Sequence, residues 1–75
     1  MSFGPVDIWK IGQDGSIVTY SFSHDGREGS FTIDVVTGAT FDIVVVPGSA
    51  GFAAKHKITQ AWREGSLPAK AVWAG

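Results

Sequence analysis

Residues 30–46 read SFTIDVVTGATFDIVVV, the most apolar run of the chain and the stretch that decides its fold. Apolar residues alternate with polar ones on both sides of a Thr-Gly pair at 37–38. This pattern is typical of two strands joined by a tight turn, because glycine accepts the positive φ that such turns need. The stretch therefore predicts a β-hairpin with strands over about 30–35 and 40–46.

The residues before this hairpin carry similar turn signals. A Gly-Gln-Asp-Gly run at 12–15 separates an expected strand at about 6–11 from another at about 16–23, and Asp-Gly at 25–26 ends the second. Such short connections favour antiparallel neighbours. A three-residue loop at 13–15 would pair Ile8 with Tyr20 and Ile11 with Ile17.

The apolar residues of these strands recur with a period of two, so one face of the sheet should line the core. Trp9, Ile11 and Ile17 should gather on the other face. The residues expected on the core face are Val6, Ile8, Val18, Tyr20, Phe22, Phe31, Ile33, Val35, Phe41, Ile43 and Val45.

A helix is predicted over about 50–64, followed by a short tail at 66–75. Gly65 and Pro68 are typical of the residues just beyond a helix end. The apolar stripe of the helix should cover Phe22, Ile33 and Ile43, while the tail should dock on the opposite face of the sheet. The residues of the stripe are Ala50, Ala54, Ile58, Ala61 and Trp62, and those that could anchor the tail are Leu67, Val72 and Trp73.

The pattern as a whole predicts a single α+β domain over residues 1–75. It is an antiparallel β-meander of about four strands with one C-terminal α-helix packed on one face. A chain of 75 residues allows one small core, and without cysteine the nine aromatic residues should supply much of its buried area. No apolar run has the length of a membrane span, and the first residues lack the basic and apolar regions of a signal peptide. We therefore expect a soluble, cytoplasmic protein.

The charges are unevenly distributed along the chain. Residues 1–49 carry two basic and six acidic side chains, whereas residues 50–75 carry four basic and one acidic. The sheet and the helix can each have their own solvated face, or the two halves can orient a partner.

Asp34 and Asp42 stand inside the apolar hairpin and are expected opposite or diagonal to one another, on the face away from the helix. They can act as charges that keep apolar strands from aggregating, as a docking surface for a basic partner, or as a carboxylate pair for catalysis or metal binding. The first interpretation agrees best with a chain that shows no cleft-forming or ligand motif.

Other signs of chemistry are weak. His24 and His56 are far apart in the chain and form no ligand motif, and the Gly-rich stretch before the helix lacks the lysine of a phosphate-binding loop. We predict no enzyme activity, no cofactor and no metal.

Phe52 is the exception on the helix, because it lies opposite the apolar stripe. Lys55, His56, Thr59 and Arg63 surround it on a helical wheel. Phe52 can fold back onto the core, or this group can form a contact surface, since aromatic and arginine side chains are enriched at protein interfaces.

We therefore predict a small non-catalytic protein-binding module, in size like a freestanding inhibitor, immunity or phage-type accessory protein. The alternative is a nucleic-acid-binding module that uses the basic helix and tail, which the acidity of the sheet disfavours. The strand at 40–46 should be a sheet edge open to a homodimer or to a protein partner. The candidate partner-binding residues are Asp34, Asp42, Val44, Phe52, Lys55, His56, Arg63 and Trp73.

Overall fold

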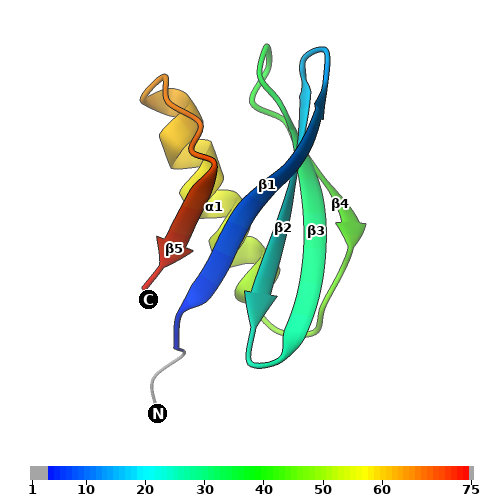
Figure 1. Ribbon diagram of the computed structural model, residues 1–75, viewed down its shortest axis with the longest axis vertical. Coiled ribbons are helices and arrows are strands. Elements are labelled where there is room, and N and C mark those ends of the chain that lie inside the picture. The colour runs from blue at the N-terminus through cyan, green and yellow to red at the C-terminus, as the bar shows by residue number, and fades with distance from the viewer. Residues whose placement is uncertain (1–3, 75) are drawn as a thin grey trace.

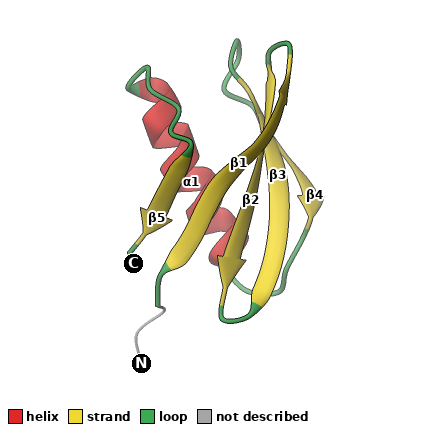
Figure 2. Ribbon diagram, viewed as in Figure 1, coloured by secondary structure: helices red, strands yellow, loops and turns green. Residues whose placement is uncertain are grey.

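One antiparallel sheet carries one helix across one of its faces, as the computed structural model of residues 4–74 shows (Figure 1). The elements in chain order are β1 (Val6–Asp14), β2 (Ile17–His24), β3 (Arg27–Asp34), β4 (Thr40–Val44), α1 (Ala50–Arg63) and β5 (Lys70–Trp73). The five strands lie in the order β4-β3-β2-β1-β5. The predicted α+β fold is confirmed, and the tail supplies a fifth strand (Figure 2).

The first two hairpins both turn through two residues, whereas the sequence suggested a three-residue loop for the first. Asp14 pairs with Ile17, so the loop holds Gly15 and Ser16 alone, and a bulge between Lys10 and Gly12 shifts the register. Ile8 therefore pairs with Phe22, and the predicted pairings of Ile8 with Tyr20 and of Ile11 with Ile17 are wrong. The second hairpin turns at Asp25 and Gly26, which both have positive φ (52° and 77°), as the type I′ turn requires.

The core lies between α1 and the inner face of β1, β2 and β3. The side chains of Val6, Ile8, Val18, Tyr20, Phe22, Phe31 and Ile33 meet Ala50, Ala53, Ala54 and Ile58 of the helix. The Phe31 ring lies 5.9 Å from that of Tyr20 and 6.2 Å from that of Phe22. Gly29 makes room for Phe22, because a Cβ built on it would stand 2.8 Å from Cε1 of that ring.

Strand β4 is where the predicted faces are wrong. Phe31 pairs with Asp42 and Thr32 with Phe41, and the register shifts again between Ser30 and Phe31. Because side chains alternate along a strand, Asp42 shares the helix side with Phe31, and Phe41 lies on the outer face. Phe41, Ile43 and Val45 are 65, 57 and 73% exposed and not part of the core.

The cause of this register is the loop between β3 and β4. The Asp34 N–H donates to the carbonyl oxygen of Ala39 at 2.9 Å, and the Gly38 N–H donates back to the carbonyl oxygen of Asp34 at 2.7 Å. These bonds set Asp34 opposite Ala39, and Phe31 then falls opposite Asp42. The main helix contacts are with the other strands, so turning the apolar side chains of β4 inward would gain little burial.

Trp62 is half-buried, and the prediction that it packs over Ile43 in the core is wrong. Its Nε1 donates to the carbonyl oxygen of Val35 at 2.8 Å, and its ring lies against Gly38. The indole thus fastens the last turn of α1 to the β3–β4 loop, while Phe22 and Ile33 lie buried in the core as expected.

The prediction that the tail docks on the outer face near Trp9 is wrong. The tail runs antiparallel to β1, with Val6 opposite Trp73 and Trp9 opposite Lys70. The Tyr20 hydroxyl donates to the carbonyl oxygen of Pro68 at 2.6 Å and so fixes the segment that leads into β5. As a result Trp73 packs at the margin of the core on the helix side.

Candidate binding surface on the helix and strand β4

The outward side of α1 presents a patch that we call the α1 patch, made of Phe52, Lys55, His56 and Arg63. These residues are three to four positions or two turns apart along the helix, so they line one side of it. The opposite side holds the buried Ala54 and Ile58, which fix the rotation of the helix on the sheet. Phe52 is 73% exposed, so it does not fold back onto the core.

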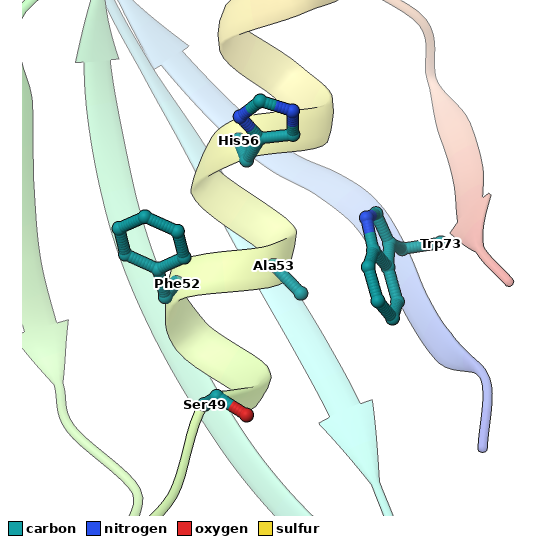
Figure 3. Close-up of a pocket in the computed structure, with 5 residues that line it drawn as sticks. All are labelled: Ser49, Phe52, Ala53, His56 and Trp73. Carbon is teal, nitrogen blue, oxygen red and sulfur yellow. The ribbon is translucent and has the colours of Figure 1, made fainter. Parts of the chain in front are cut away.

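An apolar groove of about 370 Å³ runs between α1 and β5. Phe52 and His56 lie on its helix side with Ala53 and Ser49, and Trp73 lines it from β5 (Figure 3). Along β5, Ala71 and Trp73 face inward, whereas Lys70 and Val72 face outward. The pairing of β5 with β1 brings Trp73 to the helix.

A second groove, of about 250 Å³, separates α1 from β4. Thr40 lines it from β4, and the helix contributes the α1 patch together with Thr59 and Gln60. Lys55 Nζ lies 2.9 Å from Asp42 Oδ1, so an ion pair joins the helix to β4 beside this groove. Phe52 and His56 line both grooves and form the ridge between them.

The edge strand next to this groove exposes an unusual amount of apolar surface. Beside Phe41, Ile43 and Val45, Val44 is 49% exposed, and among the strands of residues 4–74 only β3 pairs with β4. The predicted edge position of this strand is confirmed. Scattered exposed apolar residues are ordinary on protein surfaces, but a contiguous group of them indicates an interaction site.

The structure gathers most of the candidate residues predicted from the sequence. Asp42, Trp73 and the α1 patch lie around the two grooves. Val44 lies on β4 opposite Ser30, at the end of the edge. Asp34 lies apart from them at the end of β3. Its carboxylate accepts the N–H of Val36 at 2.8 Å and so shapes the β3–β4 loop. The expectation that Asp34 and Asp42 share the outer face is wrong, since Asp42 reaches Lys55 on the helix side.

Of the remaining groove residues, Thr59 was expected beside Phe52 on the helical wheel, whereas Ser49, Ala53, Thr40 and Gln60 were not predicted as site residues. Small and uncharged residues carry no signal of binding by themselves, and only the packing of β5 and α1 makes them into walls. The one signal that could have found part of this arrangement is the alternation in the tail, where residues 70–73 (KAVW) have the period of a strand.

The described residues hold no group of three or more metal-ligating side chains. No helix within 4–74 combines the length and apolar character that crossing a membrane demands. The comparisons with protein-family models, curated proteins and solved structures found no match to the chain. The features of this surface that are available to bind a partner are therefore the two adjacent grooves and the open edge of β4.

Proposed function

We propose that this domain is a non-catalytic protein-binding module, and that its partner binds across the α1 patch and the open edge of β4. The observation that carries the proposal is the concentration of exposed apolar side chains at this one margin. Phe52 stands 73% exposed on the helix, and Phe41 and Val45 stand 65 and 73% exposed on and just after β4. Aromatic anchors beside a groove, with an arginine near them, are the usual composition of protein hot spots.

The cationic residues support a protein partner better than a nucleic acid. Lys55 is paired with Asp42, and Lys10 Nζ donates to Gln13 Oε1 at 2.9 Å at the far end of β1. Lys70 lies on β5, at the opposite sheet edge from β4. Nucleic-acid binding needs several cations along one track, whereas among the described residues the groove beside α1 holds only Arg63 and the paired Lys55, and Lys10 and Lys70 lie elsewhere on the sheet.

Site-specific photo-cross-linking in the native host tests the proposal. A photoreactive phenylalanine analogue is placed at Phe52, at Phe41 or at Ile11, which is 56% exposed on β1 and serves as the matched control. We expect protein adducts from positions 52 and 41 and none from position 11. Adducts that form equally at all three positions, or none at all, would overturn the proposed surface, and nuclease-sensitive adducts would support the nucleic-acid alternative.

A further inference from the structure

The hydrogen-bonding groups of β4 that face away from the sheet can be assigned from the loop before it. The Asp34 N–H bonds to Ala39, and bonded residues alternate along an antiparallel pair. Phe41, which pairs with Thr32, therefore directs its N–H and C=O toward β3. Thr40 and Asp42 direct theirs outward, away from the sheet. Two residues of β4 thus present free backbone groups at the spacing that another strand requires.

The side chains around this edge suit a strand that is added there. An added strand would lie about 4.8 Å from β4 and would send alternate side chains to the two faces of the sheet. On the outer face they would meet Phe41, and on the other face they would enter the groove between β4 and α1. From Phe52 to Arg63 the helix rises about 16 Å, which matches about five residues of extended strand.

The charge of this groove selects the occupant. Lys55 and Arg63 line it and none of its lining residues is acidic. Asp42 is already paired with Lys55, and within residues 4–74 Arg63 has no ion-pair partner. A carboxylate on the added strand would supply the missing opposite charge. A second copy of β4 would not, because its one charged residue, Asp42, is occupied by its own Lys55.

We infer that the partner contributes an extended segment with acidic and apolar residues, which adds to the sheet alongside β4 and places carboxylates toward Arg63. This inference rests on the proposed function and specifies how the partner is held. Backbone bonds to Thr40 and Asp42 provide the affinity, and the groove and Phe41 select the side chains, as in other cases of strand addition.

A phage-displayed library of random linear peptides, selected against the whole domain, supplies the probe. We expect the enriched peptides to be acidic and apolar. On binding them, the amides of Thr40 and Asp42 should exchange with solvent at least about tenfold more slowly, because they become bonded, while the amide of Phe41, already bonded to β3, should change little. Peptides that are basic, or that leave both outward amides unprotected, would overturn the inference.

Two pairs of variants sharpen the test. D42P and D42A both lose the carboxylate, but only the proline lacks the outward N–H, so D42P should bind the selected peptides at least about tenfold more weakly than D42A. R63E should lose acidic peptides, whereas K57E, an equal charge change on the same helix outside the groove, should keep them. If D42P fails to fold, this second pair still tests the acidic side chains, and the amide exchange of Thr40 and Asp42 still tests strand addition.

The outcomes separate the two levels of the proposal. Cross-links from Phe52 together with unprotected amides at Thr40 and Asp42 would leave the protein-binding function intact and exclude strand addition. A concentration-dependent dimer that D42P abolishes and D42A retains would assign the edge to a second copy and overturn the acidic segment.

Discussion

The indole of Trp62 lies against Gly38, and a Cβ built on that glycine would stand 2.6 Å from Cη2 of the ring. Gly38 also has a φ of 78°, in the left-handed region. The contact joins the last turn of α1 to the loop that sets the register of β4. The loop that leads into β4 is thus held in place by the C-terminal end of the helix.

Replacing Gly38 with alanine should destabilise the domain by about 2–5 kcal/mol, because a left-handed alanine costs about 1–2 kcal/mol and overpacking against the ring adds about 1–3 kcal/mol. Urea denaturation measures the loss. Gly26→Ala is the control, since Gly26 has a φ of 77° and nothing within 4 Å of its Cβ position. Equal losses in both variants would mean that Trp62 does not press on Gly38.

The same contact predicts coupling between the two residues. Trp62→Ala alone should cost about 2–4 kcal/mol, toward the lower part of the range for buried tryptophan because the ring is half-buried. In the Trp62→Ala background, Gly38→Ala should cost only its backbone term of about 1–2 kcal/mol. A double-mutant cycle in urea gives the coupling energy, and strictly additive losses would contradict the geometry.

Tyr20 predicts the alkaline limit of stability. Burial raises its pKa above the ordinary value of 10.0, and its hydroxyl donates to Pro68. The folded state therefore holds the proton more tightly than the unfolded state does. Its contribution to stability is complete below the unfolded pKa of about 10 and is lost as the pH rises through the higher folded pKa.

Tyr20→Phe should therefore cost about 0.5–1.5 kcal/mol near neutral pH, for the lost hydrogen bond. It should also show a smaller fall in stability than the parent between about pH 9 and 11, since lysines titrate in both proteins. Urea midpoints across that range make the comparison, and tyrosinate absorbance reports this residue alone because the chain has one tyrosine. Identical alkaline profiles would show that Tyr20 is not a buried donor.

The ion pair between Lys55 and Asp42 should contribute little to folding. Their side chains are 27 and 43% exposed, and pairs of this kind are worth about 0–1 kcal/mol. A double-mutant cycle with Lys55→Met and Asp42→Asn should give a coupling energy in that range that falls as salt is added. A coupling above about 2 kcal/mol, insensitive to salt, would indicate a buried pair instead.

The sequence predicted those parts of the fold that depend on short-range patterns. Period two along the strands, Gly-containing turns and the stripe around Ile58 led to an α+β meander with the helix on the correct face. Phe22 and Ile33 were placed in the core for the same reason. These features follow from neighbours along the chain, where alternation and turn chemistry act directly.

The wrong pairings of β1 and the wrong faces of β4 have a common physical origin in register, whereas the tail was misplaced because its pairing with β1 is a long-range contact. A shift of one residue between β3 and β4 exchanges the two faces of β4, so Phe41 and Ile43 come out where Asp42 was expected. That shift depends on hydrogen bonds within the loop and on where α1 stops covering the sheet. Neither is visible in the alternation of β4 itself, which would have suited either face.

The exposed residues that this register creates should govern self-association. Val45 is 73% exposed at the end of the β4 edge, and an apolar edge strand is a template for uncontrolled pairing. Val45→Lys should slow aggregation at high protein concentration, because a lysine there opposes pairing of one edge with another. Val36→Lys is the matched control: Val36 is 75% exposed in the β3–β4 loop, so the same charge is added away from the edge. Light scattering of the two variants, which share a formal net charge of 0, and of the parent, with a formal net charge of −1, separates a local effect at β4 from the effect of net charge. If both variants slow aggregation equally, the replacement of any exposed valine by a charged residue, and not its place at the edge, controls association, and the exposed side chains at the β4 edge then have no special tendency to pair.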